Sequence, residues 1–142
     1  MSNFVERLND LLVDRGISPE CLASAINIST QTVYAWKSGK QQIFLSNLIS
    51  LCDYLDCSAE FISGRGDTEL GFTPQTPPLF SQAVRKMMGR KGITTYRLRK
   101  DTRYDGSYFA RWDRGAKPYL STLTELADYL GCTIDRLVGR EN

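Results

Sequence analysis

Apolar residues recur every three or four positions along most of the chain, a spacing that predicts amphipathic α-helices. The first run extends from Phe4 to Leu12 and stops at Gly16, a residue suited to a helix C-terminus. Ser18-Pro19-Glu20 then supplies an N-cap, a proline at the first helical position and an acid in the first turn. No segment shows a sustained alternation of apolar and polar residues, so strands are not expected. The pattern up to residue 65 therefore predicts five short helices, near residues 4–15, 19–26, 29–38, 45–55 and 58–62.

The second half of the chain repeats the first at an offset of about 76 residues, which falls to about 75 after one deletion near residue 45. Trp36 aligns with Trp112, and Asp53-Tyr54-Leu55 aligns with Asp128-Tyr129-Leu130. The two tryptophans follow apolar residues at helical spacing, so we expect both in the core. The stretch between the copies holds three of the five prolines. We therefore predict a first domain over 1–65, a linker over 66–78 and a second domain over 79–142.

Composition removes most enzyme classes. The 142 residues include no histidine, which excludes histidine bases, histidine nucleophile triads and histidine metal ligands. The four cysteines form no C-x-x-C, so neither a zinc site nor a redox pair is indicated. We expect no enzymatic activity, no metal and no cofactor. No apolar run approaches the length of a membrane span and no leader is visible, so we expect a cytoplasmic protein that does not contact a membrane.

The residues that recur in the two copies resemble the lambda-repressor-like Cro/XRE helix-turn-helix family. The resemblance rests on Leu22-Ala23 and on the runs from Val33 to Lys40, from Leu51 to Leu55 and from Ser58 to Arg65. The second copy carries the same pattern from Trp112 to Gly115, from Leu126 to Leu130 and from Ile134 to Arg140. The resemblance implies an all-α fold of two tandem five-helix helix-turn-helix domains.

Two departures from the family pattern stand out. The fourth helix of the family usually opens with a Ser or Thr cap, but these copies have Phe44 and Tyr119 there. This departure weakens the case for phosphate contacts from that helix end. The glutamine that often opens the second helix of the family is also missing from both copies.

The resemblance places the third helix of each copy in the DNA major groove. In the first copy, Gln31 has the geometry to pair with adenine, and Thr30 to donate a hydrogen bond or touch a thymine methyl group. In the second copy, Arg111 matches the acceptors of guanine. The full set of base candidates is Thr30, Gln31, Tyr34 and Ala35 in the first copy and Gly106, Ser107 and Arg111 in the second.

Charge separates the halves. Residues 1–75 contain 5 Lys and Arg against 9 Asp and Glu, a net charge of −4, whereas residues 76–142 contain 13 against 7, a net charge of +6. We expect the second domain to be the stronger anchor on a phosphate backbone. The candidate phosphate contacts are Lys37 and Lys40 in the first copy and Arg97, Arg99, Arg103, Arg114 and Lys117 in the second.

Two hypotheses follow. In the first, the chain is a sequence-specific regulator of transcription, bacterial or phage-derived and acting as a repressor, which binds double-stranded DNA with two unlike recognition helices. In the second, it is an adaptor or inhibitor, antitoxin-like or phage-encoded, whose acidic first domain binds a protein partner. Homodimer formation stays open at this point.

Overall fold

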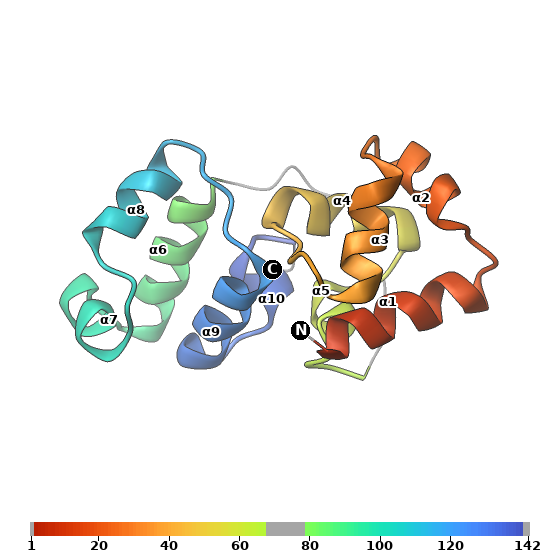
Figure 1. Cartoon of the computed structure of the whole chain (residues 1–142). Helices are drawn as coiled ribbons and strands as arrows, with labels where there is room; N and C mark the ends of the chain where they lie inside the picture. Colours follow the sequence, from red (N-terminus) through yellow and green to blue (C-terminus); the bar gives the residue numbers. More distant parts are fainter. Residues whose placement is uncertain (1, 68–78, 141–142) are drawn as a thin grey trace.

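The computed structural model describes residues 2–67 and 79–140, which form ten α-helices and no β-strand (Figure 1). The predicted all-α fold is therefore confirmed for these residues. Most of the predicted linker, residues 68–78, lies outside the described part of the chain. The first repeat consists of α1 (Ser2–Asp14), α2 (Pro19–Ala25), α3 (Thr30–Ser38), α4 (Leu45–Leu55) and α5 (Ala59–Ile62). The second consists of α6 (Phe80–Lys91), α7 (Thr95–Asp101), α8 (Gly106–Asp113), α9 (Leu120–Leu130) and α10 (Ile134–Leu137).

Side-chain caps set where most of the short helices begin. Ser18 accepts a hydrogen bond from the Cys21 amide, as the sequence pattern predicts, and Ser58 accepts one from the Phe61 amide. Thr94 and Thr133 cap α7 and α10 in the same way. At the other end of α3, Gly39 adopts φ +78°, a left-handed conformation that a residue with a side chain adopts only at a cost.

Equivalent apolar residues fill the core of each repeat. Trp36 and Trp112 are 1% and 4% exposed, so the prediction that both belong to the core is confirmed. The residues packed with them are Phe4, Leu8, Leu22 and Val33 in the first repeat and Phe80, Val84, Leu98 and Phe109 in the second. Burying these rings and aliphatic chains provides most of the stability of helices as short as these, since isolated helices of this length are marginal in water.

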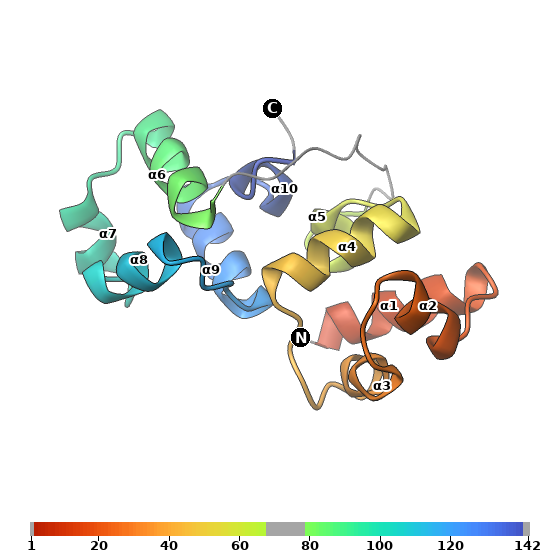
Figure 2. The same cartoon turned by 90° about the horizontal axis from the view of Figure 1, so that it is seen from above.

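The last two helices of each repeat meet in the middle of the molecule. Figures 1 and 2 show α4 and α5 beside α9 and α10, with α1–α3 on one flank and α6–α8 on the other. Phe44 and Tyr119, which precede α4 and α9, form an isolated antiparallel bridge across this contact. The arrangement leaves α3 and α8 in separate outer positions, one on each flank.

Candidate nucleic-acid interface

Helix α3 is held by its inner face and leaves its outer face open. Val33 and Trp36 are buried, and the Ser29 side chain accepts a hydrogen bond of 3.1 Å from the Thr32 amide at the start of the helix. Asn9 on α1 donates to the carbonyl of Lys37 near the end of α3, at 3.2 Å. Because both ends and the inner face are fixed, the residues on the other side are presented on a rigid element.

The predicted base candidates of α3 lie on that outer side. Gln31 and Tyr34 are exposed, and Thr30 and Ala35 are partly exposed. The Tyr34 hydroxyl donates to Glu20 on α2 at 3.1 Å, and this hydrogen bond raises the pKa of the tyrosine. The bond joins the two helices of the motif. Tyr34 is therefore engaged within the motif. Gln31 takes no part in this hydrogen bond, and its side chain is the longest polar one among the other three candidates.

Helix α8 begins at a different kind of cap. The Asp105 carboxylate accepts from the Ser107 amide at 2.9 Å and from the Ser107 hydroxyl at 2.6 Å, and these bonds lower the pKa of Asp105. The Ser107 hydroxyl is thereby oriented towards its own helix end. Gly106 is exposed and contributes only backbone. Arg111 is exposed one turn further on, with its guanidinium 4.4 Å from the centre of the Tyr108 ring.

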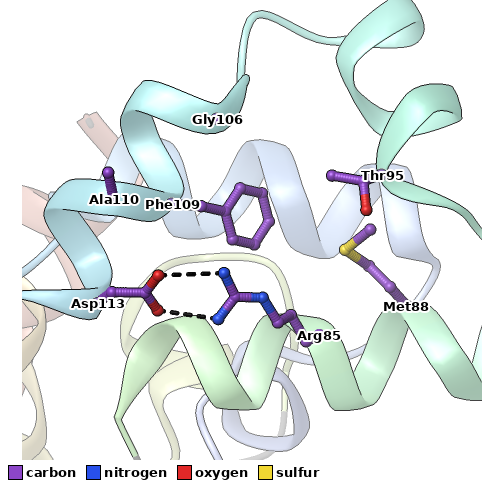
Figure 3. A pocket seen from close by; sticks show the side chains of 7 residues that line it. All are labelled: Arg85, Met88, Thr95, Gly106, Phe109, Ala110 and Asp113. Carbon is purple, nitrogen blue, oxygen red and sulfur yellow. Dashed lines mark hydrogen bonds and ion pairs between the residues drawn. The ribbon is translucent and has the colours of Figure 1, made fainter.

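The C-terminal end of α8 is held by an ion pair with α6. Arg85 on α6 donates two hydrogen bonds to the Asp113 carboxylate, at 2.8 and 3.2 Å, and this pairing lowers the pKa of Asp113 to about 2 (Figure 3). The same guanidinium lies 5.0 Å from the centre of the Phe109 ring. A bidentate arginine–carboxylate pair fixes orientation as well as distance, so it sets the orientation of α8 relative to α6.

A pocket of about 300 Å³ lies between α6, α7 and α8 beside this ion pair. Gly106 and Ala110 line its α8 side, where the first repeat has Thr30 and Tyr34 (Figure 3). The hydroxyl that ties α2 to α3 in the first repeat thus has no counterpart in the second. The second motif relies on the contact of α8 with α6 instead.

The candidate phosphate ligands fall into two groups by their partners. Arg97 donates to Asp101 at 2.9 Å and Arg103 to Glu125 at 2.6 Å, so the charge of each is partly compensated within the domain. The hydrogen bond from Tyr129, together with Arg97, lowers the pKa of Asp101. Arg99 instead lies 6.0 Å from the centre of the Tyr96 ring, which leaves its charge uncompensated by that contact. The other candidates of the second repeat, Arg114 and Lys117, are exposed; in the first repeat Lys40 is exposed and Lys37 is partly exposed.

One tyrosine that positions the second motif lies outside the candidate contacts predicted from the sequence. Tyr104, in the turn before α8, is 1% exposed and its hydroxyl donates to Glu125 on α9 at 2.9 Å. Its ring meets those of Tyr108 and Trp112, with centroids 5.0 and 5.9 Å away. Burial raises the pKa of this tyrosine. Tyr104 aligns with Ile28 of the first copy. The apolar residue at the equivalent position was the signal in the sequence that the ring of Tyr104 is buried.

The profile of the Cro/C1-type helix-turn-helix DNA-binding domain matches the chain twice, over residues 7–60 and 83–142. The chain belongs to this family. Both matches include the complete motifs, α2–α3 and α7–α8, and the predicted tandem arrangement of two such domains is confirmed. Searches of curated proteins and of solved structures gave no match.

The Cro/C1-type helix-turn-helix domain is a DNA-binding domain, and α3 and α8 are the second helices of its two motifs in this chain. Among the described residues, no helix has the length and apolarity required to span a bilayer. Within the same ranges, no group of three or more Cys, Asp or Glu side chains is gathered closely enough to hold a metal ion.

Proposed function

We propose that the chain is a sequence-specific transcriptional regulator of bacterial or phage origin, which represses by binding an operator composed of two unlike half-sites. The observation that carries the proposal is the pair of family matches combined with two different recognition surfaces. Helix α3 presents Gln31, whereas α8 presents Arg111. Repression requires only that DNA needed by the polymerase is occupied, and two DNA-binding domains supply that occupancy.

Each recognition helix favours a different base by its chemistry. The Gln31 amide offers one donor and one acceptor, which match N7 and N6 of adenine in the major groove. The Arg111 guanidinium offers two parallel donors, which match O6 and N7 of guanine. Tyr108 lies under this guanidinium and reduces its freedom, so less conformational entropy is lost when the base contact forms.

The second domain supplies the larger share of phosphate affinity in this proposal. It carries Arg99, Arg114 and Lys117 close to the motif, while the first domain carries Lys37 and Lys40. Each phosphate neutralised by one of these side chains releases counterions, which makes affinity depend steeply on salt. Arg97 and Arg103 contribute less than their charge suggests, because Asp101 and Glu125 compete for them.

The test is selection from a random-sequence DNA library with the intact chain, repeated with Gln31→Ala and Arg111→Ala. The expected wild-type motif has two dissimilar halves. Each variant loses the base preference in one half and keeps it in the other, with a loss of about 1–3 kcal/mol at the affected base pair. Lys86→Ala, an exposed position on α6, is the matched control and leaves the motif unchanged. Enrichment of no motif by the wild type refutes the proposal.

A second candidate function rests on the charge asymmetry. The first domain, with its excess of acidic residues, is the poorer match for DNA and the better match for a basic protein surface. In that case the chain is an adaptor that the second domain attaches to DNA. Charge reversal at Glu6 and Asp10 on α1 would then abolish regulation in cells without lowering DNA affinity.

A further inference from the structure

The contact between the two domains is built from pairs of equivalent residues. Arg65 follows α5 and donates to Asp128 on α9 at 2.8 Å. Arg140 follows α10 and donates to Asp53 on α4, also at 2.8 Å. In the internal repeat Arg65 aligns with Arg140 and Asp53 with Asp128. Each domain therefore presents the same arginine to the same aspartate of the other domain.

A second set of contacts repeats this exchange at the short helices α5 and α10. The Asp135 carboxylate accepts hydrogen bonds from the amides of Ala59 and Glu60, both at 2.9 Å. In return, the Glu60 carboxylate accepts from the amide of Ile134 at 2.9 Å. Glu60 aligns with Asp135 in the repeat, so each acid caps the first turn of the other domain's last helix.

A third set joins the starts of α4 and α9. The Leu45 amide donates to the Pro118 carbonyl at 2.8 Å, and the Leu120 amide donates to the Ile43 carbonyl at 2.9 Å. The rings before these helices, Phe44 and Tyr119, meet edge to face with centroids 6.3 Å apart. The missing Ser or Thr caps thus have a structural reason: backbone carbonyls of the opposite domain satisfy these helix ends.

Reciprocity of this kind is the signature of a two-fold interface. When residue i of one unit contacts residue j of the other and j contacts i in return, the two units are related by a rotation of a half turn. Three independent sets of contacts show it here, although both units belong to one chain. The domains of this chain are arranged as the two subunits of a symmetric dimer would be.

Burial of charged side chains at the contact favours this one arrangement of the two domains over others. The side chain of Asp135 is fully buried and that of Arg140 is 2% exposed, and the two lie 2.8 Å apart. Both residues belong to the second domain, and each also binds the first: Asp135 accepts from the amides of Ala59 and Glu60, and Arg140 donates to Asp53. A sliding or rotated contact would take these partners from two buried charged groups, which is costly. The interface therefore holds α3 and α8 at one relative orientation.

We propose that the chain is a single-chain pseudo-dimer whose domain interface dictates operator geometry: two unlike half-sites, inverted with respect to each other, at one fixed spacing, bound by one copy. This inference rests on the proposed function and adds its geometry. The pseudo-two-fold relation places the recognition helices in opposite directions, as inverted half-sites require. The surface through which two identical domains would otherwise pair is occupied within the chain.

The experiment measures the affinity of the intact chain for the selected operator, for an operator with half a helical turn inserted between the halves, and for one with a single half reversed in place. Wild-type affinity should fall by about 10²-fold or more in both altered operators, because only one domain then binds and the gain from linked binding is lost. Sedimentation of the complex should give one chain per operator.

Asp53→Lys/Asp128→Lys is the interface variant, since it places lysines against Arg140 and Arg65 without touching the buried Asp135. It should bind the original operator more weakly than the wild type does. Insertion of half a helical turn should then lower its affinity by a smaller factor. Asp10→Lys/Asp14→Lys on α1 adds the same charge at exposed positions and should keep the wild-type spacing penalty.

The outcomes separate the two proposals. Equal wild-type affinity for the original and lengthened operators, or two chains per operator, would overturn the pseudo-dimer while leaving sequence-specific binding intact. Absence of any selective binding would instead overturn the proposed function. The measurements with the wild-type chain test the pseudo-dimer even where the interface variant is poorly folded.

Discussion

Replacing Asp135 by alanine removes the acceptor for three hydrogen bonds, two of which cross the contact between the domains. The donors are the amides of Ala59 and Glu60, at 2.9 Å each, and the Arg140 guanidinium, at 2.8 Å. The carboxylate is fully buried, so water does not take its place in the folded chain. The substitution therefore leaves a buried cation with one partner fewer and two backbone donors at the start of α5 without their acceptor.

The magnitude follows from what Arg140 keeps. Removal of one member of a buried ion pair typically destabilises by about 3–5 kcal/mol. Arg140 retains Asp53 at 2.8 Å, and the side chain of Asp53 is 31% exposed, so the lower end of that range applies. We expect Asp135→Ala to reduce the free energy of unfolding by about 3 kcal/mol. With a urea m-value near 2 kcal/mol/M, that loss lowers the midpoint by about 1.5 M.

Urea unfolding followed by tryptophan fluorescence is the assay. Each domain contains one tryptophan, so Trp36→Phe and Trp112→Phe backgrounds report the second and first domains separately. The matched control is Asp128→Ala, which removes an interface ion pair whose carboxylate is 70% exposed and which should cost about 0–1 kcal/mol. Because the buried contact joins both domains, Asp135→Ala should lower the transitions seen by both tryptophans.

Two results would refute this reasoning. If Asp135→Ala costs no more than Asp128→Ala, the buried Asp135 carboxylate does not hold the interface together. If only the second-domain transition moves, the contact does not couple the stability of the two domains.

The remaining predictions concern the second domain. Arg111→Ala should weaken operator binding by about 1–3 kcal/mol and remove the preference for guanine at one position, measured by fluorescence anisotropy. Lys117→Ala should reduce the slope of log affinity against log salt by about 1, and Arg103→Ala by less, because Glu125 already pairs with that arginine. The pKa of Asp113 is lowered from 3.8 to about 2, so its ion pair stabilises the fold above pH 3.8 and is lost as the pH falls towards 2; Asp113→Asn should show a smaller decrease in Tm over that interval. Gly106→Ala should raise stability by about 0.5–1 kcal/mol in urea unfolding, since an added Cβ meets nothing within 4 Å.

Local structure was largely predictable because its causes lie within a few residues. Apolar spacing gave the helices, and Ser18, Ser58 and Gly39 set the ends that the structure shows. The internal repeat predicted two copies of one fold, and the family match confirms them. The burial of Trp36 and Trp112 followed from the same periodicity.

The domain interface was not predictable from the same signals. Comparison of the repeats aligns Arg65 with Arg140, but the partners of these arginines are Asp128 and Asp53, at separations of 63 and 87 residues. Alignment identifies equivalent residues rather than residues in contact, so the reciprocal pairs stayed hidden. Phe44 and Tyr119 were visible as departures from the family pattern, but the reason for them lies in the contact with the opposite domain.

Charge counting was incomplete for a related reason. The sequence gives Arg97 and Arg103 the same weight as Arg99 and Lys117 in a basic face. The structure pairs the first two with Asp101 and Glu125. Ion pairs between helices depend on packing angles that the sequence does not specify, and they decide how much charge remains for a phosphate backbone.

Hydroxyl-radical footprinting of the selected operator, at a ratio of one chain per DNA, tests most directly whether one chain reads two half-sites. We expect two protected segments about one helical turn apart, both present at that ratio, with Arg111→Ala weakening protection of one segment first. A single protected segment at one chain per DNA, with the second appearing only when another chain binds, would contradict this expectation.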